Sequence, residues 1–144
     1  MIREIVSADL NGLLQLYTHL HNNPLPEQSD ALSVLWNTIL DDKNHHIIVA
    51  ELDGRIVSSC VCVIIPNLTN SQRPYALIEN VVTEESCRNR GLAAQCLNYA
   101  KDIAQRENCY KIMLLTGSKL ESTLQFYEQA GYDRNEKTAF IQRL

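Results

Sequence analysis

The sequence predicts an α/β (α+β) fold whose elements follow the order β-α-α-β-β-β-α-β-α-β. Two observations lead to this prediction. Short apolar runs typical of strands alternate with longer segments in which apolar residues recur at helical spacing. In addition, the dipeptide Asp53-Gly54 separates two strand-like runs, which is the pattern of a tight hairpin. A chain of 144 residues has the size of one domain, and we expect residues 1–144 to form it.

The first third of the chain predicts one strand and two helices. Residues 2–6 alternate weakly and are expected to form a short strand. Ser7 can cap the helix that follows, and Pro24 and Pro26 interrupt the helical pattern before a second helix at 29–40. The apolar face of the first helix consists of Leu10, Leu13, Leu14, Tyr17 and Leu20. That of the second helix consists of Leu32, Leu35, Trp36, Ile39 and Leu40.

The middle of the chain predicts three strands. Residues 47–52 and 55–65 form the hairpin around the Asp-Gly turn, and a polar loop follows at 66–74. The next run, 75–83, is mostly apolar, so we expect a central strand that is buried on both faces.

The last third predicts two further helices and two strands. A helix is expected from about Gly91 to Glu107, then a short buried strand at 111–115. A helix at 120–130 is stopped by Gly131, and residues 137–144 close the chain as a strand. The residues of the first of these helices that are expected to face inward are Leu92, Cys96, Leu97, Ala100, Ile103 and Ala104.

Composition and charge exclude several classes of protein. Apolar residues make up 45% and charged residues 21% of the chain, as in soluble globular proteins. No apolar run reaches the roughly 18 residues of a membrane helix, and the N-terminus lacks the pattern of a signal peptide. The net charge is −4 and lysines and arginines do not cluster, which argues against nucleic acid as a partner. We therefore expect a cytoplasmic protein without a nucleic-acid or membrane partner.

The cysteines and histidines do not form a metal-binding pattern. Cys60 and Cys62 are two apart in a strand, so they share one face and differ from the usual C-x₂-C pair. The other three of the five cysteines are scattered. The four histidines form two local pairs without an acidic or thiol partner at ligand spacing. We predict free thiols and no metal.

The segment from Val81 to Ala93 is the strongest candidate for a binding site. It runs from an apolar strand through a polar turn, which contains Arg88 and Arg90, into an amphipathic helix. The first N–H groups of such a helix are unpaired, and together with positive charge they favour a phosphate or pyrophosphate. Gly91 allows the backbone to approach a ligand closely. The alternative is that both arginines are solvated surface charges.

Two motifs resemble those of the GCN5-related N-acetyltransferases (GNAT superfamily). Arg88-x-x-Gly91-x-Ala93 is similar to the pyrophosphate loop of this family, and residues 126–132, Phe-Tyr-Glu-Gln-Ala-Gly-Tyr, are similar to its Phe-Tyr-Glu-Lys-x-Gly-Phe segment. The resemblance covers nearly the whole chain. It implies a mixed, mostly antiparallel central sheet flanked by about four helices. It also implies an acetyl-CoA-dependent N-acetyltransferase that moves an acetyl group to a primary amine of a small molecule by direct attack. The alternative is a non-catalytic acyl-CoA-binding or regulatory module on the same fold.

The resemblance also assigns roles to individual residues. The pyrophosphate would bind the backbone N–H groups from Asn89 to Ala93, and the pantetheine arm would follow the preceding strand, where an N–H near Val81 polarises the acetyl carbonyl. Tyr127 would protonate the leaving thiolate; the alternative is a core tyrosine. The cofactor-binding residues implied in this way are Val81, Val82, Thr83, Arg88, Asn89, Arg90, Gly91, Leu92 and Ala93.

Glu79 is the candidate general base. It lies in an otherwise apolar strand just before the expected acetyl position. A carboxylate among apolar residues is unfavourable unless it is paired, so its presence there suggests a function. It could accept the ammonium proton directly or through a water. The alternatives are that it binds the substrate ammonium or pairs with an arginine. The sequence also departs from the family, because Leu120 stands where many members have a pantetheine-binding asparagine; Ser118 or Ser122 could replace it.

The acceptor and the oligomeric state are less constrained. Residues 78–81, Ile-Glu-Asn-Val, and residues 110–132 resemble glucosamine-6-phosphate N-acetyltransferases, although Asn80 stands where those enzymes carry a second carboxylate. An amino-sugar phosphate is therefore one candidate acceptor. The loops expected to select it contain His21, Asn22, Asn23, Glu27, Asp30, Asn67, Asn70 and Arg73. Family members often dimerise through their C-terminal strands, so a homodimer is expected.

Overall fold

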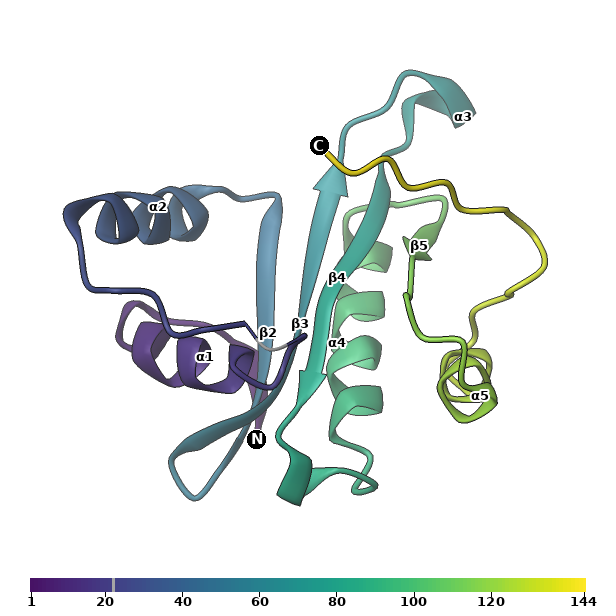
Figure 1. Cartoon of the computed structure of the whole chain (residues 1–144). Coiled ribbons are helices and arrows are strands. Elements are labelled where there is room, and N and C mark those ends of the chain that lie inside the picture. The colour runs from purple at the N-terminus through teal and green to yellow at the C-terminus, as the bar shows by residue number, and fades with distance from the viewer. Residues whose placement is uncertain (22) are drawn as a thin grey trace.

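The computed structural model describes residues 1–21 and 23–144, and a five-stranded sheet forms its centre (Figure 1). The strands lie in chain order, with three antiparallel pairings followed by one parallel pairing between the last two strands. The mixed, mostly antiparallel sheet is thus confirmed. The strands are β1 (Ile2–Glu4), β2 (His45–Leu52), β3 (Arg55–Ile65), β4 (Tyr75–Thr83) and β5 (Ile112–Leu114).

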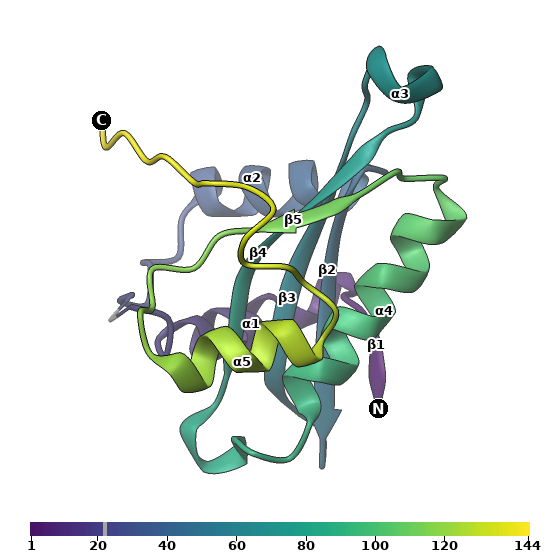
Figure 2. The same ribbon diagram turned by 90° about the vertical axis from the view of Figure 1, so that its right-hand side faces the viewer.

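Helices cover both faces of this sheet. Helices α1 and α2 lie on one face and α4 on the other, while α5 lies beside β5 (Figures 1 and 2). Two short 3₁₀ helices, η1 and η2, precede α1 and α4. The helical elements are η1 (Ser7–Asp9), α1 (Leu10–Tyr17), α2 (Asp30–Asp41), α3 (Thr69–Gln72), η2 (Glu85–Cys87), α4 (Leu92–Arg106) and α5 (Glu121–Gln129).

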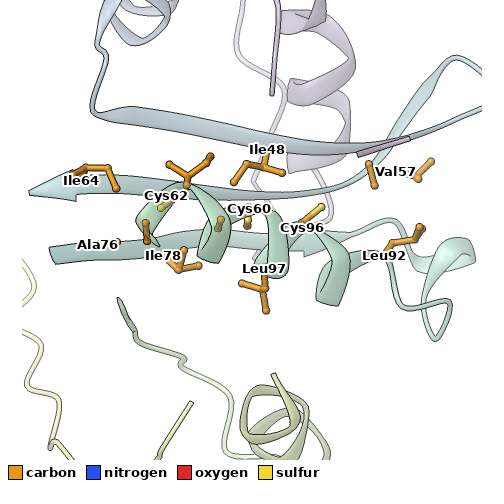
Figure 3. Packing of buried hydrophobic residues seen from close by; sticks show 14 of the residues in the cluster. Ile48, Val57, Cys60, Cys62, Ile64, Ala76, Ile78, Leu92, Cys96 and Leu97 are labelled. Carbon is orange, nitrogen blue, oxygen red and sulfur yellow. The ribbon is translucent and has the colours of Figure 1, made fainter. Parts of the chain in front are cut away.

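The main core lies between the sheet and α4. All six residues predicted to face inward from α4 are buried, and they pack against strand residues such as Ile48 and Ile78 (Figure 3). Cys60 and Cys62 belong to the same cluster, which confirms that they share one face of β3. Burial of this continuous apolar surface is the dominant stabilising contribution to such a fold.

A second core lies under α1 and α2. Leu13, Trp36 and residues from β2 and β3 form it, and the Trp36 Nε1 donates a hydrogen bond to the Ser7 carbonyl at 3.1 Å. Leu35 was predicted in the buried face of α2 but is 55% exposed. Because Trp36 faces the sheet, its neighbour Leu35 is rotated about 100° away toward solvent. In α1 the buried face includes Leu16, which the predicted set did not contain.

The helix start at Ser7 also differs from the prediction. Ser7 forms no side-chain cap. Instead, the Val6 N–H donates to the Asp9 carboxylate at 2.7 Å, and the same carboxylate binds Arg3. The Asp53-Gly54 turn is as expected: both residues have positive φ, 50° and 75°, as a type I′ hairpin turn requires.

Strand β4 is not buried on both faces. Its buried residues alternate as far as Ile78, and Glu79 and Asn80 are exposed. The reason is that α1 and α2 pack mainly on β2 and β3, so β4 contributes no buried residue to the second core. The outer face of β4 is therefore partly open near its middle.

The predicted final strand at 137–144 is wrong. Every residue after Tyr132 is exposed and none belongs to a strand; Phe140 is 89% and Ile141 64% exposed. The segment leaves α5 and crosses the molecule without pairing with β5, so its strand-forming side chains find no ladder (Figure 2). The strand predicted at 111–115 is shortened to Ile112–Leu114 and only half-buried, since that edge is uncovered.

Candidate active site

A bulge in β4 is the first feature of the candidate site. The register of β4 on β3 shifts between Ser59 and Val61, so that Asn80 and Val81 together lie opposite Cys60. Two residues opposite one define a β-bulge. Asn80 has a φ of 51°, a left-handed conformation that asparagine tolerates better than most residues. The bulge interrupts the ladder within the segment expected to bind the acetyl group.

One backbone edge of β4 is open beyond this bulge. Its parallel pairing with β5 ends at Ile78, which lies opposite Leu114. Among the residues that the structure describes, no strand lies on that side of residues 79–83. The open edge contains the three residues expected beside the pantetheine arm: Val81, Val82 and Thr83. Unpaired backbone groups in a separated strand can pair with the amides of an extended ligand.

The N-terminus of α4 follows directly from this edge. Asn89 and Gly91 both have positive φ, 60° and 75°, and Gly91 is the N-cap residue. The Gln95 N–H makes the first helical bond, to the Gly91 carbonyl at 3.0 Å, whereas in the described structure the N–H groups of residues 89–94 donate to no protein acceptor. Consecutive free N–H groups at a helix start form an anion-binding concavity.

The two arginines of the turn are exposed beside this concavity. Arg88 lies back on the end of β4, where its Nε donates to the Thr83 carbonyl at 3.4 Å. Neither Arg88 nor Arg90 forms an ion pair with a carboxylate of the described residues. Their charge is therefore not neutralised within the protein and adds to the positive end of the α4 dipole.

Tyr127 lies on α5 in an aromatic group. Its ring is edge-on to Phe126 and to Tyr132, with centroids 5.0 and 6.3 Å apart, and it lines a cavity of about 760 Å³ between β5, α5 and the C-terminal segment. Burial raises the pKa of Tyr127, and the nearby Cys60 thiol raises it further. Tyr127 packs against the main core, to which Cys60 also belongs, and its phenol is protonated at neutral pH.

Glu79 lies immediately before the bulge. It is exposed, so it is not the buried carboxylate that the apolar run suggested. It forms no ion pair with any described residue, which removes support for a structural pairing with an arginine. A solvent-accessible carboxylate beside the bulge can accept a proton from an amine or hold an ammonium group.

Similarity to known proteins shows the family to which this chain belongs. The pattern that describes the acetyltransferase (GNAT) family matches residues 10–132. The chain belongs to this family. It is therefore an N-acetyltransferase, and its five-stranded sheet flanked by helices matches the fold of acetyltransferase structures.

Individual relatives of this acetyltransferase support the assignment. A glucosamine 6-phosphate N-acetyltransferase from Trypanosoma brucei brucei is 30% identical over 141 residues, covering 94% of this chain and 90% of the relative. The solved structure of a proposed acetyltransferase from Agrobacterium tumefaciens str. C58 is 38% identical, with a TM-score of 0.93 over 100% of this chain and 99% of that one. A transcriptional regulator from Bacillus halodurans C-125 is 25% identical, with a TM-score of 0.87 over 99% of both chains.

The acetyltransferase departs from the family pattern at the start of α5. Leu120 is the N-cap residue, is 68% exposed and offers no side-chain hydrogen bond. Ser118 is already engaged, because its hydroxyl donates to Thr123 and accepts from the Leu120 N–H. Ser122 is exposed and remains the free hydroxyl of the two that the sequence offered as replacements.

Some of the polar side chains expected to select the acceptor already form hydrogen bonds within the acetyltransferase. The Arg73 guanidinium donates to the carbonyls of Asn108 and Cys109, at 3.1 and 3.0 Å, and so stabilises the end of α4 rather than facing a ligand. The Asn67 amide bonds Thr69 and the Arg73 carbonyl. His21 and Asn23 are exposed, and the expectation for Asn22 lies outside the described residues.

Three site features were not deduced from the sequence. The first is the bulge, in which Asn80 is left-handed and lies with Val81 opposite Cys60. The asparagine within an apolar strand is the sequence feature that could have indicated it. Tyr132 supports the ring of Tyr127, and burial raises the pKa of Tyr132 as well. Tyr17, on α1, has a buried hydroxyl near the bulge, whereas its helical spacing indicated core packing alone.

The part of the chain that the structure describes contains neither a metal-binding group nor a membrane-spanning helix. Over residues 1–21 and 23–144, no three His, Cys, Asp or Glu side chains are grouped so that they could hold a metal ion. Within the same described ranges, no helix has the length and apolar character to cross a membrane. All five cysteines are free thiols, four of them buried.

Proposed function

We propose that this acetyltransferase moves the acetyl group of acetyl-CoA to a primary amine of a small molecule, by direct attack of the amine on the thioester. The observation that carries the proposal is the continuity between the open edge of β4 and the free N–H groups of α4. An extended ligand with an anionic end and amide groups along its length matches this shape.

The cofactor would follow that path. Its pyrophosphate would accept hydrogen bonds from the backbone between Asn89 and Ala93, with charge from Arg88 and Arg90. Its pantetheine arm would pair with the backbone of Val81, Val82 and Thr83. The acetyl carbonyl would then lie at the bulge, where a backbone N–H near Val81 stabilises the developing oxyanion. One such donor is typically worth about 3–4 kcal/mol of barrier.

The proton transfers would use Glu79 and Tyr127. Glu79 takes the proton of the ammonium group, directly or through a water, and the free amine attacks the acetyl carbon. The C–N bond forms, the C–S bond breaks, and the Tyr127 hydroxyl gives its proton to the leaving thiolate. General acid–base steps of this kind contribute about 10²–10⁴-fold.

The burial of Cys60, Cys87 and Cys96 supports direct attack over a covalent acetyl-enzyme. Cys60 and Cys96 are fully buried, and burial raises the pKa of both thiols, that of Cys96 to about 11. A buried thiol without an adjacent base does not ionise at neutral pH, and the thiolate is the nucleophile. Free thiols also fit a reducing compartment, so we propose the cytoplasm as the site of action.

An amino-sugar phosphate is the acceptor candidate that we would test first. The proposal rests on the similarity to the trypanosomal glucosamine 6-phosphate N-acetyltransferase and on the exposed Glu79, whose charge suits an ammonium group. The test is mass spectrometry of the products after incubation with acetyl-CoA and glucosamine 6-phosphate. We expect one acetyl group on the sugar nitrogen and none on the protein. An acetylated cysteine that turns over would contradict direct attack.

The second candidate function is a non-catalytic acyl-CoA-binding or regulatory module. The similarity to a protein described as a transcriptional regulator favours it. It predicts that acetyl-CoA binds in calorimetry without any turnover, and that Tyr127→Phe leaves binding and regulation unchanged. Turnover that depends on the Tyr127 hydroxyl would exclude it.

We also propose a homodimer. The outer edge of β5 has no partner among the described strands, and the C-terminal segment exposes Phe140, Ile141 and Leu144. An unpaired edge beside exposed apolar side chains favours association with a second copy. Light scattering of the intact chain should give twice the monomer mass. Replacing Phe140 and Ile141 by serine should give the monomer, and a dimer that persists in this variant would contradict the interface.

A further inference from the structure

The hydroxyl of Tyr17, the last residue of α1, has an unusual environment. Its oxygen is buried and has no hydrogen-bond partner within the part of the chain that the structure describes. A polar group buried without a partner is destabilising. Native proteins keep few such groups, and those that persist are concentrated at functional sites. The hydroxyl is therefore a candidate for a bond that forms only when a ligand is present.

The neighbours of this hydroxyl define what it can do. Burial raises the pKa of Tyr17 to about 12, while the polar side chains of Ser59 and Asn80 beside it lower this pKa. Neither neighbour has hydrogen-bond geometry to it in the free protein. The Ser59 hydroxyl already donates its proton to the Ile48 carbonyl at 2.8 Å. The Tyr17 proton is thus available, and the oxygens of both the Ser59 hydroxyl and the Asn80 amide have lone pairs that can accept it. Ser59 is fully buried, whereas Asn80 is exposed, so Asn80 is the neighbour that can also contact a ligand.

Asn80 connects this buried hydroxyl to the reaction site. It is exposed and lies in the β4 bulge with a left-handed backbone. Tyr17 packs against the second core, and α1, which carries it, lies on the face of the sheet that α4 does not cover (Figure 1). In the acetyl transfer proposed above, the acceptor would approach an acetyl group on the open edge of β4 from this face.

We propose that Tyr17 is a positioning residue that acts through Asn80. When the acceptor binds, the Tyr17 hydroxyl donates to the Asn80 Oδ1, and the amide NH₂ of Asn80 donates to an oxygen of the acceptor next to its amino group. The acceptor is then an amine with an oxygen on the neighbouring carbon, such as an amino alcohol. The inference rests on the acetyl transfer proposed above and deepens it.

The first test is Tyr17→Phe, with Tyr99→Phe on α4 as the matched control. We expect kcat/KM for an amino-alcohol acceptor to fall about 5–30-fold, the value of one or two hydrogen bonds, with KM for acetyl-CoA unchanged. The melting temperature of the free protein should stay the same or rise, because the hydroxyl has no partner to lose. A purely structural tyrosine would instead lower the melting temperature. A Tyr17→Phe chain that fails to fold would therefore overturn the proposal.

The second test is a double-mutant cycle with Asn80→Gly, which removes the amide but keeps the left-handed backbone. If Tyr17 acts through Asn80, the double variant is no slower than Asn80→Gly alone. Multiplicative effects of the two changes would contradict this coupling. Unchanged acceptor kinetics in Tyr17→Phe would overturn the positioning role and leave acetyl transfer intact, whereas a wild-type protein that turns over no amine would remove both proposals.

Discussion

Tyr127 and Glu79 have contrasting environments, and the contrast suits opposite proton transfers. Tyr127 is half-buried in an aromatic group, and burial keeps its pKa above the usual range, so it holds its proton at neutral pH. Glu79 is exposed and unpaired by any described cation. A protonated phenol can act as a general acid, and an exposed carboxylate can act as a general base.

The first prediction concerns the acid. Tyr127→Phe should lower kcat by about 10²–10³-fold, because the leaving thiolate loses its proton donor, while acetyl-CoA binding in calorimetry stays within about 2-fold. Tyr132→Phe is the matched control, since its ring packs against Tyr127 in the same aromatic group and it should keep most activity. Equal losses in both variants would mean that the ring packing, not the Tyr127 hydroxyl, matters.

The second prediction concerns the base. Glu79→Gln should lower kcat/KM for the acceptor at neutral pH by about 10²-fold, since the amide cannot take the ammonium proton. The loss should shrink as the pH approaches the pKa of the amine, because the free amine no longer needs a base. Glu107→Gln, at the far end of α4, is the control. A loss that stays constant with pH would assign Glu79 to ammonium binding instead.

At the level of elements, the junction of β4 and α4 carries the proposed cofactor path. The bulge and the end of the β5 pairing open one edge of β4, and two left-handed residues turn the chain so that the α4 N–H groups stay free. Gly91 is needed here for its φ of 75° rather than for space, since an added Cβ would meet only the Gln95 side chain at 3.9 Å.

The third prediction tests this junction. Gly91→Ala forces a left-handed alanine, which costs about 1–2 kcal/mol. Relaxation of the turn should misalign the N–H groups and weaken acetyl-CoA binding about 5–30-fold in calorimetry. Gly117→Ala is the control, because its Cβ would meet nothing within 4 Å and its φ is not positive. Unchanged affinity in Gly91→Ala would place the pyrophosphate elsewhere.

Across the whole molecule, the hydrophobic pattern of the sequence predicts the buried residues correctly where an element has one long buried face. The inward face of α4 was predicted residue by residue, because a 15-residue helix over a sheet repeats its pattern several times. The Asp53-Gly54 hairpin was predictable for a different reason, since few residues accept two successive positive φ angles.

Other features depend on contacts that periodicity does not encode. The strand expected at 137–144 has suitable residues, but a strand forms only where an edge pairs with it. The bulge at Asn80 adds one residue to a ladder, and nothing local fixes which residue it is. At the site, the loop and Glu79 could be located from the sequence, whereas the Tyr17 hydroxyl near Asn80 requires the packing of α1 on the sheet.

The fourth prediction concerns stability in alkali. Burial raises the pKa of Cys62 to about 12 and that of Cys96 to about 11, from 9.0, and that of Tyr17 to about 12, from 10.0. The unfolded chain therefore releases these protons at lower pH than the folded chain. Stability from these groups is complete below about pH 9 and is lost as the pH rises toward 12. Urea unfolding at a series of pH values should show this decline. A free energy of unfolding that is constant from pH 8.5 to 11 would contradict it.

The central claim is acetyl transfer, and thiol release from acetyl-CoA tests it most directly. The wild-type protein and acetyl-CoA would be incubated with glucosamine 6-phosphate, polyamines, amino acids, aminoglycosides or lysine peptides. A reaction without any amine is the control. We predict amine-dependent thiol release with at least one acceptor, and its loss in Tyr127→Phe. No release with any amine, together with no binding of acetyl-CoA in calorimetry, would contradict the account.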